Sequence, residues 1–166
     1  MRNLVLPALV ALALPVAALA ADDGPSPVDL ATSACKSEKA QMGAKTFKAV
    51  YAAGTTSGAT KACVAKRDGA AAGDLKNAAK ECKAQRAADP AAFASKWGTN
   101  KNDRNAYGKC VSATARGAVE QDTNARVNAA RACRKLRTEQ KAAFEQAYGT
   151  KANAFGRCVS KTARGG

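Results

Sequence analysis

The sequence predicts an all-α fold in which three tandem disulfide-closed helical hairpin repeats follow a signal peptide. Apolar residues recur at helical spacing after typical helix starts, and six cysteines fall into three similarly spaced pairs. A stretch of about 45 residues also returns along the chain. Units of that size bury little apolar surface, and alanine supplies most of the 46% apolar fraction, so we expect crosslinks to hold them.

Residues 1–20 are predicted to be a secretory signal peptide. Arg2 precedes an apolar run, and Ala18-Leu19-Ala20 fits a small-x-small cleavage site. The alternative is a membrane anchor, but the apolar run is short and contains Pro7 and Pro15. Cleavage near Ala20 would release a secreted, periplasmic or cell-envelope protein with no integral membrane span in the mature chain.

The rest of the chain is divided into a leader and three repeats. We expect a flexible leader at 21–29, repeat 1 at 30–67, repeat 2 at 74–117 and repeat 3 at 123–166. Repeat 1 is the most degenerate copy. Linkers are expected at Asp68–Gly73 and around Gly117 to Asn124, where glycine and polar residues gather. Few large apolar residues favour partly independent repeats, whereas short repeats usually need to stack on a neighbour; both arrangements stay open.

Repeat 2 carries the clearest signals for helix starts and ends. A first helix is expected after Asp74 and a short second helix from Asp89-Pro90 to Gly98. A third is expected from an Asn105 cap to Gly117. The break at Asp89-Pro90 folds the repeat into a hairpin. Thr138 should cap the short helix of repeat 3, and Asp29 the first helix of repeat 1.

Each repeat contains two aromatic residues one helical turn apart. The pairs are Phe47/Tyr51, Phe93/Trp97 and Phe144/Tyr148. We interpret them as packing between the tip of each hairpin and its stem. The alternative is a surface on which bases or sugar rings stack.

Six cysteines in an exported chain predict three disulfides. The repeat places one pair inside each copy at equivalent positions, with spacings of 28, 28 and 25 residues. The predicted pairs are Cys35–Cys63, Cys82–Cys110 and Cys133–Cys158. Metal binding is the alternative, but the chain has no histidine and no Cys-x-x-Cys pair.

The net charge of +14 rises along the chain, from +2 over residues 21–73 to +7 over residues 122–166. A basic exported protein is attracted to acidic polymers such as a wall polymer, nucleic acid or an anionic glycan. A merely solvated surface is the alternative. The candidate anion-binding residues are Lys76, Lys80, Lys83, Arg131, Arg134, Lys135 and Arg137.

The sequence does not predict an enzyme, and it indicates no cofactor. It has no histidine, no Gly-x-Ser-x-Gly turn, no pair of carboxylates in a plausible pocket and no phosphate-cradling loop. The segment Thr99–Asp103 is only distantly similar to a calcium loop, because it holds one acid beside cations.

One string of repeat 2 resembles a tandem cysteine-pair repeat of exported bacterial proteins that carry no assigned function. The resemblance covers residues 74–116 and 125–164 well and 30–67 poorly, where the Asn-Ala-aromatic-Gly before Cys63 is missing. It implies export and repetition and no particular activity. The string runs Asp89-Pro90-Ala91-Ala92-Phe93, then Gly98-Thr99-Asn100-Lys101-Asn102, then Asn105-Ala106-Tyr107-Gly108-Lys109-Cys110-Val111-Ser112.

The function expected from these features is non-enzymatic binding of acidic polymers at the cell envelope or outside the cell. One alternative is a structural or spacer protein that has no anionic ligand. Another is a membrane-active or toxin-like protein, although alanine-rich faces are weakly apolar for deep insertion into lipid.

Overall fold

The computed structural model describes residues 24–53, 58–100 and 102–165. These residues form seven helices and no strand, which confirms the all-α prediction. The expected signal peptide at 1–20 and the leader residues 21–23 lie outside the described ranges. The helices are α1 (Pro27–Met42), α2 (Ala44–Tyr51), α3 (Ala59–Ala88), α4 (Pro90–Trp97), α5 (Ala106–Glu139), α6 (Lys141–Tyr148) and α7 (Ala154–Thr162).

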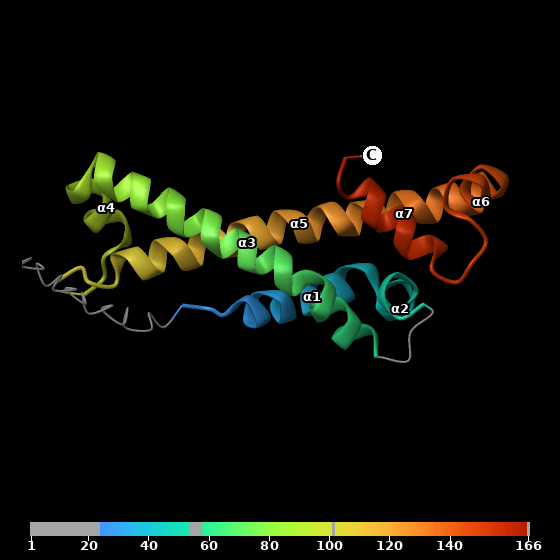
Figure 1. Ribbon diagram of the computed structural model, residues 1–166, viewed down its shortest axis with the longest axis horizontal. Helices are drawn as coiled ribbons and strands as arrows, with labels where there is room; N and C mark the ends of the chain where they lie inside the picture. Colours follow the sequence, from blue (N-terminus) through green and yellow to red (C-terminus); the bar gives the residue numbers. More distant parts are fainter. Residues whose placement is uncertain (1–23, 54–57, 101, 166) are drawn as a thin grey trace, which may run out of the picture.

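Three long helices form the body of the molecule. α1, α3 and α5 pack along one another, and α5 alone is roughly 50 Å long at 1.5 Å per residue. Figure 1 shows an elongated arrangement in which α4 lies at one end and α2, α6 and α7 lie toward the other. No helix in the described part of the chain is both long enough and apolar enough to cross a membrane.

The first helix begins earlier than expected. Ser26 is its N-cap: the Ser26 hydroxyl accepts from the Asp29 amide at 3.2 Å, and the Asp29 carboxylate accepts from the Ser26 amide at 3.1 Å. Pro27 occupies the first helical position. The prediction of an Asp29 cap was therefore wrong, and the last leader residues are helical.

The Asp89-Pro90 signal is confirmed, whereas two other predicted caps are not. The Asp89 carboxylate accepts from the Ala92 amide at 2.9 Å, and α4 ends just before Gly98. Asn105 precedes α5, but its side chain makes no capping bond to that helix. Thr138 lies in the last turn of α5, where its hydroxyl donates to main-chain carbonyls of the preceding turn, and α6 begins after Gln140.

Both predicted linkers are helical, which corrects the sequence interpretation. Asp68–Gly73 lies inside α3, as does the expected cap Asp74, and the segment around Gly117 to Asn124 lies inside α5. Ala71, Ala115 and Val119 from these helices pack with α1 in one buried cluster. That packing outweighs the cost of about 1 kcal/mol that each internal glycine imposes on a helix.

Because α3 and α5 continue through the predicted linkers, each is an arm of two successive hairpins. Cys63 and Cys82 both lie on α3, and Cys110 and Cys133 both lie on α5. The three predicted disulfides are confirmed, with Cα–Cα distances of 6.0, 5.9 and 6.0 Å in chain order.

The largest buried cluster joins repeat 1 to repeat 3. Phe47 and Tyr51 of α2 lie with Val127 of α5 and Phe155 of α7. α7 approaches α2 so closely that a Cβ added at Gly156 would lie 2.6 Å from the carbonyl oxygen of Val50. Repeats 1 and 3 therefore share one core rather than forming independent units.

The aromatic pairs pack against the stems of their hairpins, as predicted. Phe47, Tyr51 and Phe144 are buried in the cluster that holds the cysteines of repeats 1 and 3, and Tyr148 packs against it. Ring centroids lie 4.9 Å apart in Phe47/Tyr51 and 5.3 Å apart in Phe144/Tyr148. In repeat 2, Phe93 is buried beside the Cys82–Cys110 disulfide, and Trp97 packs half-buried against the same cluster.

Candidate anion-binding site

All seven cations proposed from the sequence are exposed, but they do not form one patch. The first three, Lys76 to Lys83, lie on the second half of α3. The other four, Arg131 to Arg137, lie on the last turns of α5. Figure 1 shows these two segments toward opposite ends of the molecule. Lys135 is 4.0 Å from Glu139 in an exposed ion pair, which holds it only weakly.

Arg134 and Arg137 line a surface groove between the start of α2 and the end of α5, hereafter the α2–α5 groove. Lys45 lines it from the α2 side, and no carboxylate is among the lining residues. The groove encloses roughly 550 Å³. Three cations therefore line one groove with no acid among the described residues of its walls, whereas Arg131 and Lys135 lie outside it.

Both arginines of the groove are held by neighbouring side chains. The Arg134 guanidinium donates to the hydroxyl of Thr46, which is 88 residues away in the chain. The Arg137 guanidinium lies 4.8 Å from the centroid of the Phe155 ring, within the range of a cation–π interaction. Such contacts limit the rotamers of the two side chains before any ligand binds.

Lys45 was not identified from the sequence as a candidate. It belongs to repeat 1 and meets the arginines only because repeat 1 packs on repeat 3. Gly43 adopts φ +80°, a left-handed value that glycine tolerates, where the chain turns from α1 into α2. That turn sets the direction of α2 and so places Lys45 at the groove.

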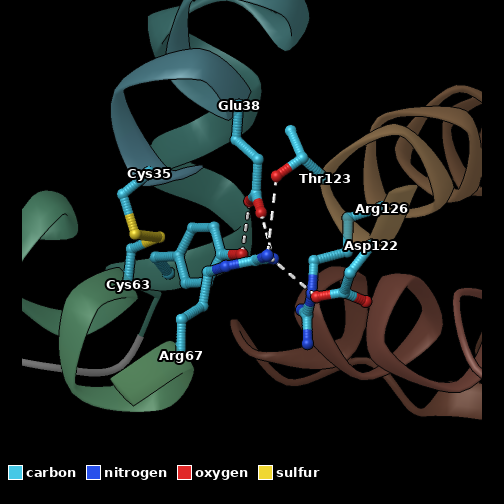
Figure 2. The surroundings of a disulfide bond; sticks show 8 residues. Cys35, Glu38, Cys63, Arg67, Asp122, Thr123 and Arg126 are labelled. Atoms are coloured by element: carbon cyan, nitrogen blue, oxygen red, sulfur yellow. Dashed lines mark hydrogen bonds and ion pairs between the residues drawn. A yellow bond between two sulfur atoms is a disulfide. The ribbon is translucent and has the colours of Figure 1, made fainter. Parts of the chain in front are cut away.

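A second charged feature lies inside the molecule and was also missed. Glu38, Tyr51 and Arg67 are almost fully buried, with exposed fractions of 0%, 1% and 3%. The Tyr51 hydroxyl and the Arg67 guanidinium each donate to the Glu38 carboxylate at 2.5 Å. The other side of the Arg67 guanidinium lies 2.9 Å from the half-exposed Asp122 carboxylate. Figure 2 shows this buried ionic network between α1, α2, α3 and α5.

The first disulfide explains why these groups meet. Glu38 follows Cys35 by three residues and Arg67 follows Cys63 by four, so each lies one helical turn from its cysteine. The disulfide brings the two helices together, and the next turn of each contributes one member of the ion pair. This spacing was readable in the sequence.

Burial controls the protonation of the network. Desolvation raises the pKa of the Glu38 carboxyl, and the Tyr51 hydrogen bond and the charge of Arg67 oppose that shift. Desolvation, with the Glu38 charge, also raises the pKa of Tyr51, so its hydroxyl stays protonated and remains a donor. Its hydrogen bonds and ion pairs link α1, α2, α3 and α5.

The described residues contain no group of three or more side chains of the kinds that ligate metals. Of the cations predicted from the sequence, Arg134 and Arg137 converge in the α2–α5 groove. No family model, curated protein or solved structure matches this chain, and its resemblance to cysteine-pair repeats stays a prediction.

Proposed function

We propose that this protein is an exported, non-enzymatic binding protein that holds acidic polymers in the α2–α5 groove. The observation that carries the proposal is the convergence of Lys45, Arg134 and Arg137 with no carboxylate among the lining residues. Three closed disulfides are typical of proteins that work in an oxidising compartment, which supports a secreted, periplasmic or envelope location.

The groove is suited to a repeating anionic group rather than to one defined small molecule. It is open to solvent and supplies guanidinium, ammonium and hydroxyl donors. Binding of this kind releases counterions, so the affinity should fall steeply as salt increases. Wall polymers, nucleic acids and anionic glycans all present such groups, and the groove contacts would be insensitive to their sequence.

The test compares two variants that lose the same charge from different faces. The groove variant is Lys45→Gln/Arg134→Gln/Arg137→Gln, and the matched variant is Lys76→Gln/Lys80→Gln/Lys83→Gln on α3. Oxidised protein beginning at Ala21 is applied to immobilised DNA, heparin and a wall polymer and eluted with salt. We expect wild type to elute well above ~0.15 M salt and the groove variant to elute much earlier than the α3 variant.

Equal losses in the two variants would assign retention to net charge and remove the groove from the proposal. An Arg134→Lys/Arg137→Lys variant keeps the charge and should keep most of the retention. If it elutes as early as the glutamine variant while its thermal unfolding is unchanged, binding requires the planar guanidinium of arginine and not only its charge.

A spacer function is the second candidate, because the structure is elongated and is crosslinked along its length. Elution of wild type below ~0.15 M salt from every polymer would favour it. A membrane-active role has less support, since Val28 is the one exposed large hydrophobic side chain among the described residues.

A further inference from the structure

Two surface clefts outside the α2–α5 groove are lined by the same motif. The string Asn-Ala-aromatic-Gly-basic-Cys-Val-Ser occurs at 105–112 and again at 153–160. The repeat-2 cleft contains Lys109 and Arg116 of α5, and the repeat-3 cleft contains Arg157 and Arg164 at the corresponding positions. Neither cleft shares a lining residue with the α2–α5 groove.

Polar and aromatic residues of the two clefts correspond as well. Each cleft contains the motif asparagine and serine, which are Asn105 and Ser112 in one and Asn153 and Ser160 in the other. Each also contains the last aromatic residue of the preceding short helix. The aromatic residues are Trp97 and Tyr148. With Gly108 and Gly156 the two clefts correspond at six positions, as expected of two copies of one repeated unit.

Additional cations enter each cleft from outside the motif. Lys96 of α4 joins the repeat-2 cleft. Lys66 of α3 and Lys161 of α7 join the repeat-3 cleft. Among the described residues, no carboxylate lines either cleft and none of these cations forms an ion pair with an acid. The clefts thus concentrate three and four positive charges, whose mutual repulsion an anion would relieve.

The donors of the repeat-2 cleft are partly organised already. The Lys109 ammonium donates to the Thr99 hydroxyl at 2.5 Å, and the Asn105 amide donates to the same oxygen at 2.8 Å. The Lys96 ammonium lies 4.9 Å from the centroid of the Trp97 ring. An oxyanion with several oxygens can use such clustered donors better than a single carboxylate can, because each oxygen accepts charge-assisted hydrogen bonds.

We propose that each cleft binds one phosphate or sulfate ester group and that the two clefts together hold a linear polyanion. The two sites are additional to the α2–α5 groove and do not depend on it. Their separation follows from α5: Ser112 lies 21 residues before Cys133, which corresponds to ~32 Å, and the Cys133–Cys158 disulfide fixes α7 at that point. A small anion fills one cleft, whereas a longer chain reaches both and gains affinity by avidity.

Trp97 makes the repeat-2 cleft observable, because it is the only tryptophan in the chain and lines that cleft. Titration of the oxidised protein with inorganic pyrophosphate at low salt should change Trp97 fluorescence and saturate. A Lys109→Gln/Arg116→Gln variant should lose the response. The control Lys76→Gln/Lys80→Gln, which removes the same charge from α3, should keep the same half-saturation within about twofold. Absence of any saturable response in wild type would overturn the repeat-2 site.

The repeat-3 cleft is tested with polymers of two lengths. In an Arg157→Gln/Arg164→Gln variant the pyrophosphate response of Trp97 should be unchanged. The affinity for an oligomer much longer than 30 Å should fall roughly tenfold or more, while that for an oligomer too short to span the clefts should not change. Equal losses for both lengths would overturn the two-site arrangement.

Single-stranded DNA tests phosphate groups and heparin fragments test sulfate groups. The polymer that binds with the higher affinity identifies the source of the oxyanion. An Arg134→Gln/Arg137→Gln variant should keep the Trp97 response, because the groove is a separate site. If that variant loses retention on polymers while wild type gives no Trp97 response, the clefts are excluded and the groove stands. Circular dichroism checks that each variant is folded. A Lys109→Arg/Arg116→Lys variant keeps both charges and should give the same Trp97 response as wild type.

Discussion

Replacing Arg67 with methionine is expected to destabilise the protein strongly at neutral pH. The substitution removes the cation of the buried ionic network and leaves the fully buried Glu38 carboxylate with Tyr51 as its remaining close donor. Breaking a buried pair by removing one partner costs about 3–5 kcal/mol. For a chain of this length that loss corresponds to a fall in Tm of roughly 10–15 °C.

The loss should depend on pH in a definite direction. Burial already raises the folded-state pKa of Glu38 above its ordinary value of 4.5, and the charge of Arg67 lowers it in opposition. Without Arg67 the folded-state pKa rises further, so the native state holds a proton that the unfolded state releases. Stability therefore falls as pH increases from the ordinary pKa of glutamate up through the raised folded-state pKa.

The assay is urea unfolding of the oxidised variant at pH 4 and at pH 7. We expect a small loss at pH 4, where Glu38 is largely protonated in both states, and the full loss at pH 7. A Glu38→Gln/Arg67→Met variant should recover part of the stability and lose the pH dependence that Glu38 adds in the single variant. Lys76→Met, at an exposed position of the same helix, should change the free energy of unfolding by about 0.5 kcal/mol or less. A loss that is equal at both pH values, or below about 1 kcal/mol at pH 7, would refute this account.

Two further predictions concern glycines and the packing of the helices. Gly156→Ala places a methyl group 2.6 Å from the Val50 carbonyl oxygen, and this overpacking outweighs the gain in helix propensity. Urea unfolding should therefore show that the free energy of unfolding falls by about 1–2 kcal/mol. Gly117→Ala meets nothing within 4 Å inside α5 and should stabilise by about 0.5–1 kcal/mol. A stabilised Gly156 variant would contradict the close contact of α2 and α7, and an unchanged Gly117 variant would contradict a continuous α5.

Short-range signals accounted for the features that were predicted correctly. The Asp89-Pro90 start of α4 depends on one side chain and one fixed φ, and both act within a single turn. The three disulfides were found because equivalent cysteines recur with similar spacing. The Ser26 cap of α1 is equally local, but the sequence prediction placed the cap three residues later, at Asp29.

The candidate sites were only partly visible in the sequence. Lys109 and Arg116 share one face of a predicted helix, so their proximity follows from helical spacing alone. Lys66 meets Arg157, and Lys45 meets Arg134, only after repeat 1 has packed on repeat 3. No local pattern encodes that residues about 90 positions apart line the same cavity.

The helical class, the disulfide pairing and the basic surface follow from the sequence, because periodicity, cysteine spacing and charge are properties of the chain. Tertiary structure alone decided that α3 and α5 run unbroken through the glycine-containing segments, since burial against α1 supplies the free energy that local propensity lacks. It also decided that Glu38 and Arg67 are buried together and that cations from distant repeats line shared cavities. These outcomes depend on which helices come into contact, and that is set by packing of the whole chain.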